Sequence, residues 1–166
     1  MKPCMTALTI LAVLALGRAD TTPHRADCSI FVLKDCPIAN QYAPELQRII
    51  KRYSPVGVHF KLVFEDSDGT QKSAEEHAKT YGFSIPVVLD TKAKIAKKRG
   101  VNTSPSVVLT ANGKDIYVGR IDDLYPRIGV QRPYAKTHDL RDALDAFLAG
   151  KAIKVKKTQA VGCRLY

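Results

Sequence analysis

Apolar runs and amphipathic segments alternate along the first part of the chain, and they predict strands and helices in turn. Residues 30–33 form an unbroken apolar run with β-branched and aromatic members, which is typical of a buried strand. Residues 37–53 are amphipathic, with Tyr42, Leu46 and Ile49 at helical spacing. Residues 58–65 alternate and predict a second strand. A strand, a helix and a strand of these lengths form a βαβ unit, so we expect the two strands to be parallel.

Shorter patterned segments follow in the second half of the chain. We expect Ser73 to cap the first of the later helices and Thr137 to cap the last. Asn112-Gly113 is a strong hairpin signal and predicts antiparallel pairing of the strands on either side. The expected elements are a helix over 73–81, a strand over 86–90, a helix over 91–99, strands over 103–109 and 115–121, and a helix over 137–149. The pattern predicts an α/β protein with a mixed sheet.

The first residues have the composition of a cleaved leader. Lys2 precedes an apolar run over 5–16, and Gly17-Arg18-Ala19 offers the small residues that a signal peptidase reads. The run is too short for a membrane span, so we expect no integral membrane segment once it is removed. The predicted organisation is a signal peptide over 1–19, a lead-in over 20–28, a domain over 29–150 and a tail over 151–166 that carries Cys163. The protein is then exported, to a periplasm or to the medium.

The charge of the chain is positive but points to no particular partner. Loss of Lys2 and Arg18 with the leader lowers the net charge from +10 to +8. Two basic runs, 92–99 and 151–157, contain no interleaved aromatic residues and favour a solvated surface over nucleic-acid binding. The four histidines stand at no metal-ligand spacing. We therefore predict no nucleic-acid partner, no metal and no cofactor.

Cys36 stands where the first strand gives way to the first helix. Unpaired backbone N–H groups and the positive end of the helix dipole collect at such a position, and both stabilise a thiolate. The thiolate is the reactive form of cysteine, so Cys36 is a candidate nucleophile. The alternative is a small buried core residue, which free cysteines often are.

Several motifs around this cysteine carry a family resemblance. The run Cys-Pro-Ile-Ala-Asn at 36–40, the following Tyr-Ala-Pro-Glu with Pro44 eight residues after Cys36, and the Val-Gly-Cys near the C-terminus resemble thioredoxin-fold redoxins of the AhpC/TSA-like class, in particular a secreted group. The resemblance implies a three-layer α/β sandwich, with a central mixed sheet and helices on both faces. It also implies an antioxidant or thiol–disulfide oxidoreductase whose partners are a protein thiol or disulfide substrate and a reductant.

The resemblance extends to the candidate substrate site. Pro105 matches the cis-proline that thioredoxin-fold proteins place beside the active cysteine, and Ser104 before it would then face the thiol and pair with an extended peptide. We expect Pro37, Asn40, Ser104 and Pro105 to bind substrate. The loop over 119–133 contains a Gly-Arg-Ile-Asp-Asp run of the same redoxin group and fits either a functional loop or a structural turn.

Other proteins of the same fold use motif residues that this chain does not have. Thioredoxins resolve with a second cysteine at the place of Ala39, and copper-delivery relatives carry one at the place of Asn40. Peroxiredoxins carry a threonine at the place of Leu33, so efficient peroxide reduction is not expected. Three function classes stay open: a thiol oxidoreductase using Cys36, a metal or assembly factor, and a non-catalytic binding domain.

The pairing of the cysteines is the open question of the sequence. Cys28 and Cys36 flank one strand, about 25 Å apart at the rise of a β-strand, so they cannot form a disulfide. Cys163 lies in the tail, thirteen residues after Gly150, and a tail of that length can return to Cys36. Cys163 therefore either resolves a mixed disulfide on Cys36 or forms a structural disulfide with Cys28, or all three thiols are free. The oligomeric state is left open.

Overall fold

The computed structural model describes residues 26–166. The predicted signal peptide and most of the predicted lead-in lie outside the described residues. No helix among residues 26–166 is both long enough and apolar enough to cross a bilayer.

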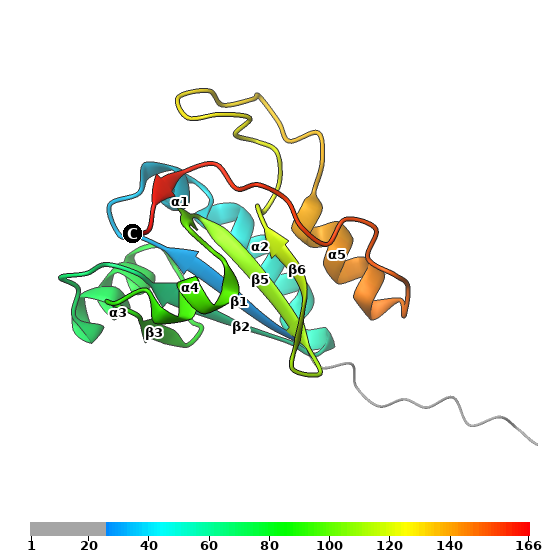
Figure 1. The fold of residues 1–166 in the computed structure, drawn as a ribbon, viewed down its shortest axis with the longest axis horizontal. Coiled ribbons are helices and arrows are strands. Elements are labelled where there is room, and N and C mark those ends of the chain that lie inside the picture. The colour runs from blue at the N-terminus through cyan, green and yellow to red at the C-terminus, as the bar shows by residue number, and fades with distance from the viewer. Residues whose placement is uncertain (1–25) are drawn as a thin grey trace, which may run out of the picture.

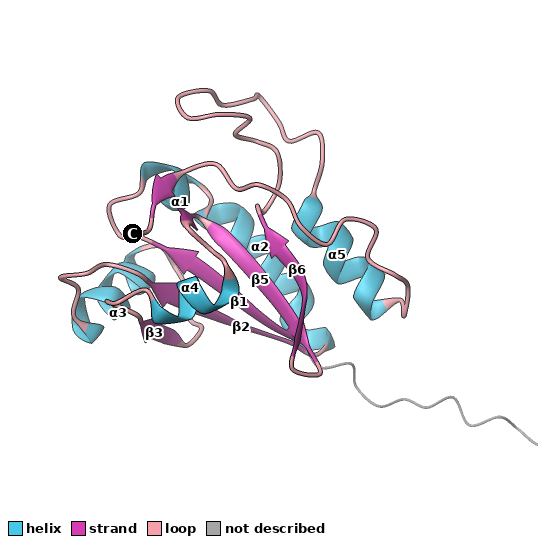
Figure 2. Ribbon diagram, in the orientation of Figure 1, coloured by secondary structure: helices cyan, strands magenta, loops and turns pink. Residues whose placement is uncertain are grey.

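A five-stranded mixed sheet forms the centre of the molecule (Figure 1, Figure 2). Its order is β3-β2-β1-β5-β6. β1 is parallel to β2 and β2 is parallel to β3, whereas β5 is antiparallel to both β1 and β6. The parallel βαβ unit and the hairpin at Asn112-Gly113 are thus confirmed. The strand bounds are β1 Ala26–Val32, β2 Val58–Phe64, β3 Val87–Leu89, β5 Ser106–Ala111 and β6 Lys114–Gly119.

Helices cover both faces of this sheet. Alternation along β1 sends Ile30 into the core on one face and Phe31 into the core on the other. α2, α3 and α5 pack on the first face and α4 on the second, which Figure 1 shows as α2 behind the sheet and α4 in front of it. The helix bounds are α1 Pro37–Gln41, α2 Ala43–Tyr53, α3 Gln71–Thr80, α4 Lys94–Arg99 and α5 Asp139–Leu148, with a 3-10 turn at Ser54–Val56. The predicted three-layer α/β sandwich is confirmed.

The beginning of the domain differs from the prediction in two places. β1 begins at Ala26, so residues 26–28 of the predicted lead-in belong to the strand, where Ala26 pairs with Val58 of β2. The expected helix over 37–53 is divided at Tyr42 into α1 and α2. Pro44 stands in the first turn of α2, where its missing N–H costs no helical hydrogen bond.

Three helix starts were also predicted wrongly. Thr70 rather than Ser73 is the cap of α3, because the two side chains form a reciprocal capping box in which Ser73 is the inner partner. His138, not Thr137, is the residue directly before α5, and the N–H of Thr137 donates a hydrogen bond to Asp123. α4 begins at Lys94 rather than at residue 91.

The start of α4 is set by the carboxylate of Asp90, which directly follows β3 and lies four residues before the helix. Asp90 accepts hydrogen bonds from the N–H groups of Lys94 and Ile95, at 2.9 and 2.5 Å. Ala93, directly before the helix, has a positive φ of 50°. The carboxylate therefore takes the capping role that no residue adjacent to the helix supplies.

A second, two-stranded sheet closes the end of the molecule. β4 (Thr103–Ser104) pairs antiparallel with β7 (Cys163–Arg164) in the C-terminal tail. Figure 1 shows the tail in red, running from α5 back across the sheet to end beside α1. On the way Val118 of β6 makes a parallel bridge with Lys157. The tail is therefore part of the folded domain, and its last strand pairs beside α1.

Candidate functional site

Cys36 is the residue before the first turn of α1, at the end of the loop that follows β1. Its N–H donates to the carbonyl of Leu33 at 3.3 Å, and Pro37 occupies the first position of the helix. The side chain is 1% exposed, and its thiol donates to the carbonyl of Ser104 at 3.3 Å. The sulfur is thus buried against a polar backbone group as well as against the core.

Ser104 and Pro105 lie directly beside this thiol. The peptide bond between them is cis, as the resemblance predicted. Ser104 is fully buried, and its hydroxyl accepts a hydrogen bond from the N–H of Leu33 at 3.0 Å. One serine therefore fixes the end of β1 with its side chain and meets the Cys36 thiol with its backbone.

Cys163 reaches the same place through β7. It stands opposite Ser104 in the antiparallel pair with β4. Burial raises the pKa of the Cys163 thiol to about 11, and a hydrogen bond and charge interaction with the Cys36 thiol add to the shift. The structure thus brings Cys163 to Cys36.

Gly162 explains how the tail comes so close. A Cβ added to this residue would lie 1.8 Å from the carbonyl oxygen of Ser104 and 2.8 Å from its carbonyl carbon. Both atoms are backbone atoms of a buried residue and cannot move away. A glycine before Cys163 is therefore a requirement of this strand pairing.

Cys28 has a different environment. It lies within β1, paired with Phe60 of β2 and Leu109 of β5, and it is fully buried. Burial raises its pKa to about 12. This is the environment of an inert core residue, and β7 pairs Cys163 with Ser104 rather than with any residue of β1.

Asn40 serves the loop before Cys36. Its side-chain amide donates to the carbonyl of Lys34 at 2.9 Å, and the same carbonyl contacts Nε2 of His77 at 3.1 Å. The N–H of Lys34 in turn donates to both carboxylate oxygens of Asp66 at 3.2 Å. These three side chains hold the loop on both sides, so the structure gives Asn40 a positioning role; Pro37 by contrast is exposed.

A buried acid next to this loop was missed by the sequence analysis. Glu65 follows β2 and is 2% exposed, and no described group donates a hydrogen bond to either of its carboxylate oxygens. Burial, and then the negative charge of Asp90, raises the pKa of Glu65 to about 8. The only sequence signal was the pair of acids Glu65-Asp66 directly after an apolar strand.

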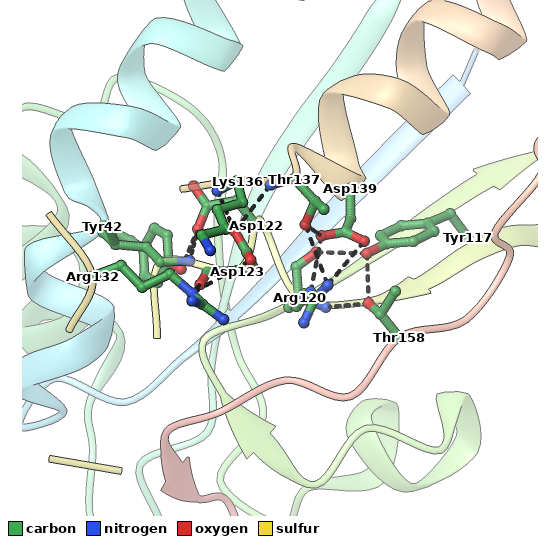
Figure 3. Close-up of polar contacts among 11 residues, drawn as sticks. Tyr42, Tyr117, Arg120, Asp122, Asp123, Arg132, Lys136, Thr137, Asp139 and Thr158 are labelled. Atoms are coloured by element: carbon green, nitrogen blue, oxygen red, sulfur yellow. Dashed lines mark hydrogen bonds and ion pairs between the residues drawn. The ribbon is translucent and has the colours of Figure 1, made fainter. Parts of the chain in front are cut away.

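Arg120 joins the tail to the domain (Figure 3). Its guanidinium donates to Asp139 at the start of α5 at 2.9 Å, and its backbone N–H donates to Oγ1 of Thr158 at 3.0 Å. The hydroxyl of Tyr117 contacts the same Oγ1 at 2.7 Å. A Cβ on Gly119 would lie 2.1 Å from that oxygen, so the tail passes the end of β6 at van der Waals distance.

The loop over 119–133 is held by its two aspartates, as Figure 3 also shows. Asp122 accepts a hydrogen bond from the hydroxyl of Tyr42 at 2.5 Å, at the break between α1 and α2. Asp123 accepts from the backbone N–H of Lys136 and Thr137, at 2.5 and 3.0 Å. Of the two predicted roles of this loop, the structure supports the turn held by aspartates.

The described residues offer no obvious metal centre. No three His, Cys, Asp or Glu side chains among residues 26–166 are grouped so that they could hold an ion. The two thiols meet at Ser104, whose carbonyl accepts the Cys36 thiol and which stands opposite Cys163 in the pair of β4 and β7.

Comparison with known proteins shows the fold. No protein-family model and no curated sequence matches the chain. An uncharacterized conserved protein from Geobacillus kaustophilus has a TM-score of 0.74 at 24% identity, over 86% of this chain and 77% of that protein. A hypothetical protein from Sinorhizobium meliloti 1021 has a TM-score of 0.73 at 23% identity, over 86% and 80%.

A third structure carries a functional description. A protein described as a candidate thiol:disulfide interchange protein from Chlorobium tepidum has a TM-score of 0.58 at 19% identity, over 76% of this chain and 82% of that protein. These likenesses confirm the predicted thioredoxin-like fold. The finer resemblance to a secreted redoxin group stays a prediction.

Proposed function

We propose that this chain is an exported thiol–disulfide oxidoreductase, with Cys36 as its nucleophile and Cys163 as its resolving thiol. One observation carries the proposal: β7 pairs with β4 so that Cys163 stands opposite Ser104, whose carbonyl accepts the Cys36 thiol at 3.3 Å. The structural likeness to a candidate thiol:disulfide interchange protein supports the same reaction class. The substrate is a protein disulfide or an oxidised protein sulfur, and a partner dithiol regenerates the enzyme.

The reaction has two exchange steps. The Cys36 thiolate attacks one sulfur of a substrate disulfide, the S–S bond breaks, and the other substrate sulfur leaves as a thiolate that takes up a proton. The Cys163 thiolate then attacks the Cys36 sulfur of the mixed disulfide and expels the second substrate thiolate. The substrate gains two electrons, and the enzyme ends as a Cys36–Cys163 disulfide.

Each remaining site residue has a positioning role in this scheme. The hydroxyl of Ser104 fixes β4 to the residue after β1 by a hydrogen bond, and the amide of Asn40 fixes the loop before Cys36 in the same way. Pro105 directly follows β4, the strand with which β7 pairs. Pro37 is exposed beside the nucleophile, where an incoming substrate can touch it before the tail moves.

Trapping of the intermediate tests the proposal. The reduced chain is mixed with a disulfide-bonded peptide, and products are separated under denaturing, thiol-blocked conditions and weighed. We expect Cys163→Ser to stop at a peptide adduct on Cys36, Cys36→Ser to form no adduct, and Cys28→Ala to behave as the unchanged chain. An adduct on Cys163 in the Cys36→Ser variant, at the rate of the unchanged chain, contradicts the assigned order.

A non-catalytic binding role is the second candidate, and the burial of Cys36 favours it. A thiol that is 1% exposed cannot meet a protein disulfide unless the tail moves. If Cys36 stays unreacted with disulfides in every variant while partner proteins bind to the edge of β4, the chain is a binding domain. The trapping experiment separates the two roles.

A further inference from the structure

The tail contacts the domain at two separate places. Near β6, the N–H of Val118 donates to the carbonyl of Lys156, and the N–H of Thr158 donates to the carbonyl of Val118, both at 3.0 Å. Beyond Gly162, β7 pairs with β4. Between these contacts, residues 159–162 run beside two surface hollows of about 510 and 480 Å³. Within the segment after Thr158, Val161 and Cys163 pack against the core, and the remaining attachment is at its far end.

That far end is anchored by one apolar side chain. Leu165 is 8% exposed, and its N–H donates to the carbonyl of Asn102 at 3.1 Å. It fills a pocket between α4 and the sheet, which we call the Leu165 pocket. The pocket is lined by Phe31, Val63, Ala93, Ala96, Val101 and Val108.

The tail therefore holds an extended peptide in register with the nucleophile. Gly162 passes the carbonyl of Ser104 without a side chain, Cys163 lies at Cys36, and Leu165 fills the pocket two residues later. If the segment leaves, Cys36 and the Leu165 pocket become accessible together. Any peptide that takes its place meets the same three constraints.

We propose, on the basis of the function proposed above, that the Leu165 pocket is a specificity site for substrate proteins. The preferred partner is an extended segment with glycine directly before its cysteine and a large apolar side chain two residues after it. Such a segment adds to β4 in place of β7 by strand pairing, and the pocket reads its apolar side chain. The protein's own tail competes with it.

Because the protein's own tail competes with any added peptide for β4, the test must not depend on simple binding equilibrium. A tethered segment acts at an effective concentration on the order of millimolar, so a free peptide in simple equilibrium displaces it poorly. Covalent capture avoids this difficulty. A peptide Ala-Val-Gly-Cys-Arg-Leu-Tyr is prepared with its cysteine bonded to 5-thio-2-nitrobenzoate, together with one peptide in which alanine replaces leucine and one in which alanine replaces glycine.

The reduced Cys163→Ser chain is mixed with each peptide. The Cys36 thiolate attacks the peptide sulfur, the bond to thionitrobenzoate breaks, and the coloured thionitrobenzoate anion leaves as the mixed disulfide forms. We expect the leucine peptide to react roughly tenfold faster than its alanine counterpart, and the glycine peptide to exceed its alanine counterpart by at least as much. Equal rates for the three peptides overturn the proposal.

A small disulfide and a second variant complete the design. The symmetric 5,5′-dithiobis(2-nitrobenzoate) is a small disulfide that does not need the Leu165 pocket. If Cys36 reacts with it while the three peptides react at equal rates, the specificity site is rejected and the proposed function stands. An inert Cys36 toward every disulfide overturns both. Adding Leu165→Ser to the Cys163→Ser chain should raise the rate of the leucine peptide roughly 30-fold and keep its preference over alanine. Adding Gln159→Ala instead, on the exposed part of the tail, should change neither the rate nor the preference.

Discussion

Replacement of Gly162 by alanine should release the tail from β4. The new methyl group would lie 1.8 Å from the carbonyl oxygen of Ser104. That oxygen cannot retreat, because Ser104 is fully buried and its hydroxyl is bonded to the N–H of Leu33. The tail must therefore leave, and with it Leu165 leaves its pocket.

The size of the effect follows from the contacts that are lost. Burial of a leucine contributes about 2 kcal/mol, and the backbone hydrogen bonds of the tail contribute about 1 kcal/mol beyond what water returns. A loss of about 3 kcal/mol raises the population with an open site by roughly 100-fold. The contacts of Thr158 near β6 are not affected, so the first part of the tail stays attached.

Alkylation of Cys36 measures this population directly. In the Cys163→Ser background, iodoacetamide labelling followed by mass spectrometry should be roughly 100-fold faster with Gly162→Ala than without it. Gln159→Ala in the same background should leave the rate unchanged, because Gln159 is an exposed residue of the same segment. An unchanged rate in the Gly162→Ala chain, with the far-ultraviolet spectrum intact, refutes the pairing of β7 with β4.

Three further predictions concern titration and packing. Because the pKa of Glu65 is raised from 4.5 to about 8 in the folded state, its contribution to stability is complete below pH 4.5 and is lost as the pH rises to about 8. Glu65→Gln should reduce this loss, which is on the order of 5 kcal/mol over that pH range in urea unfolding, whereas the exposed Glu75→Gln should not. Alkylation of Cys163 in the reduced chain should rise roughly tenfold per pH unit from neutrality toward its pKa of about 11; a plateau near neutral pH contradicts this raised pKa. Tyr42→Phe should lower the free energy of unfolding by about 1–2 kcal/mol, because it removes the hydrogen bond to the buried Asp122; an unchanged midpoint argues against that bond.

Local pattern sufficed for the sheet and for the position of Cys36 between a strand and a helix. Unbroken and alternating apolar runs gave β1 and β2, and Asn112-Gly113 gave the hairpin, because each depends on residues close in sequence. Cys36 was found in the same way, since it stands between a strand and a helix. Helix starts were predicted wrongly because the capping residue need not be the one that the local pattern favours. Asp90 caps α4 from four residues before it, and the capping box of α3 contains two residues that could each be the cap.

The arrangement of the tail depends on contacts that the sequence does not encode locally. Nothing in residues 159–166 indicates that they pair with β4, because two-residue strands carry no periodic pattern. Gly162 gains its meaning only from the carbonyl of Ser104, and Leu165 only from the pocket beneath α4. The sequence therefore left Cys163 with two partners, and the fold placed it next to Cys36.

A disulfide map of the oxidised protein tests this account most directly. The native, reduced chain is oxidised under mild conditions, its remaining thiols are blocked, and the peptides of a protease digest are identified by mass spectrometry without reduction. The account predicts one bond between Cys36 and Cys163, with Cys28 recovered as a free thiol only after unfolding. A bond between Cys28 and Cys163, with Cys36 free, would contradict it.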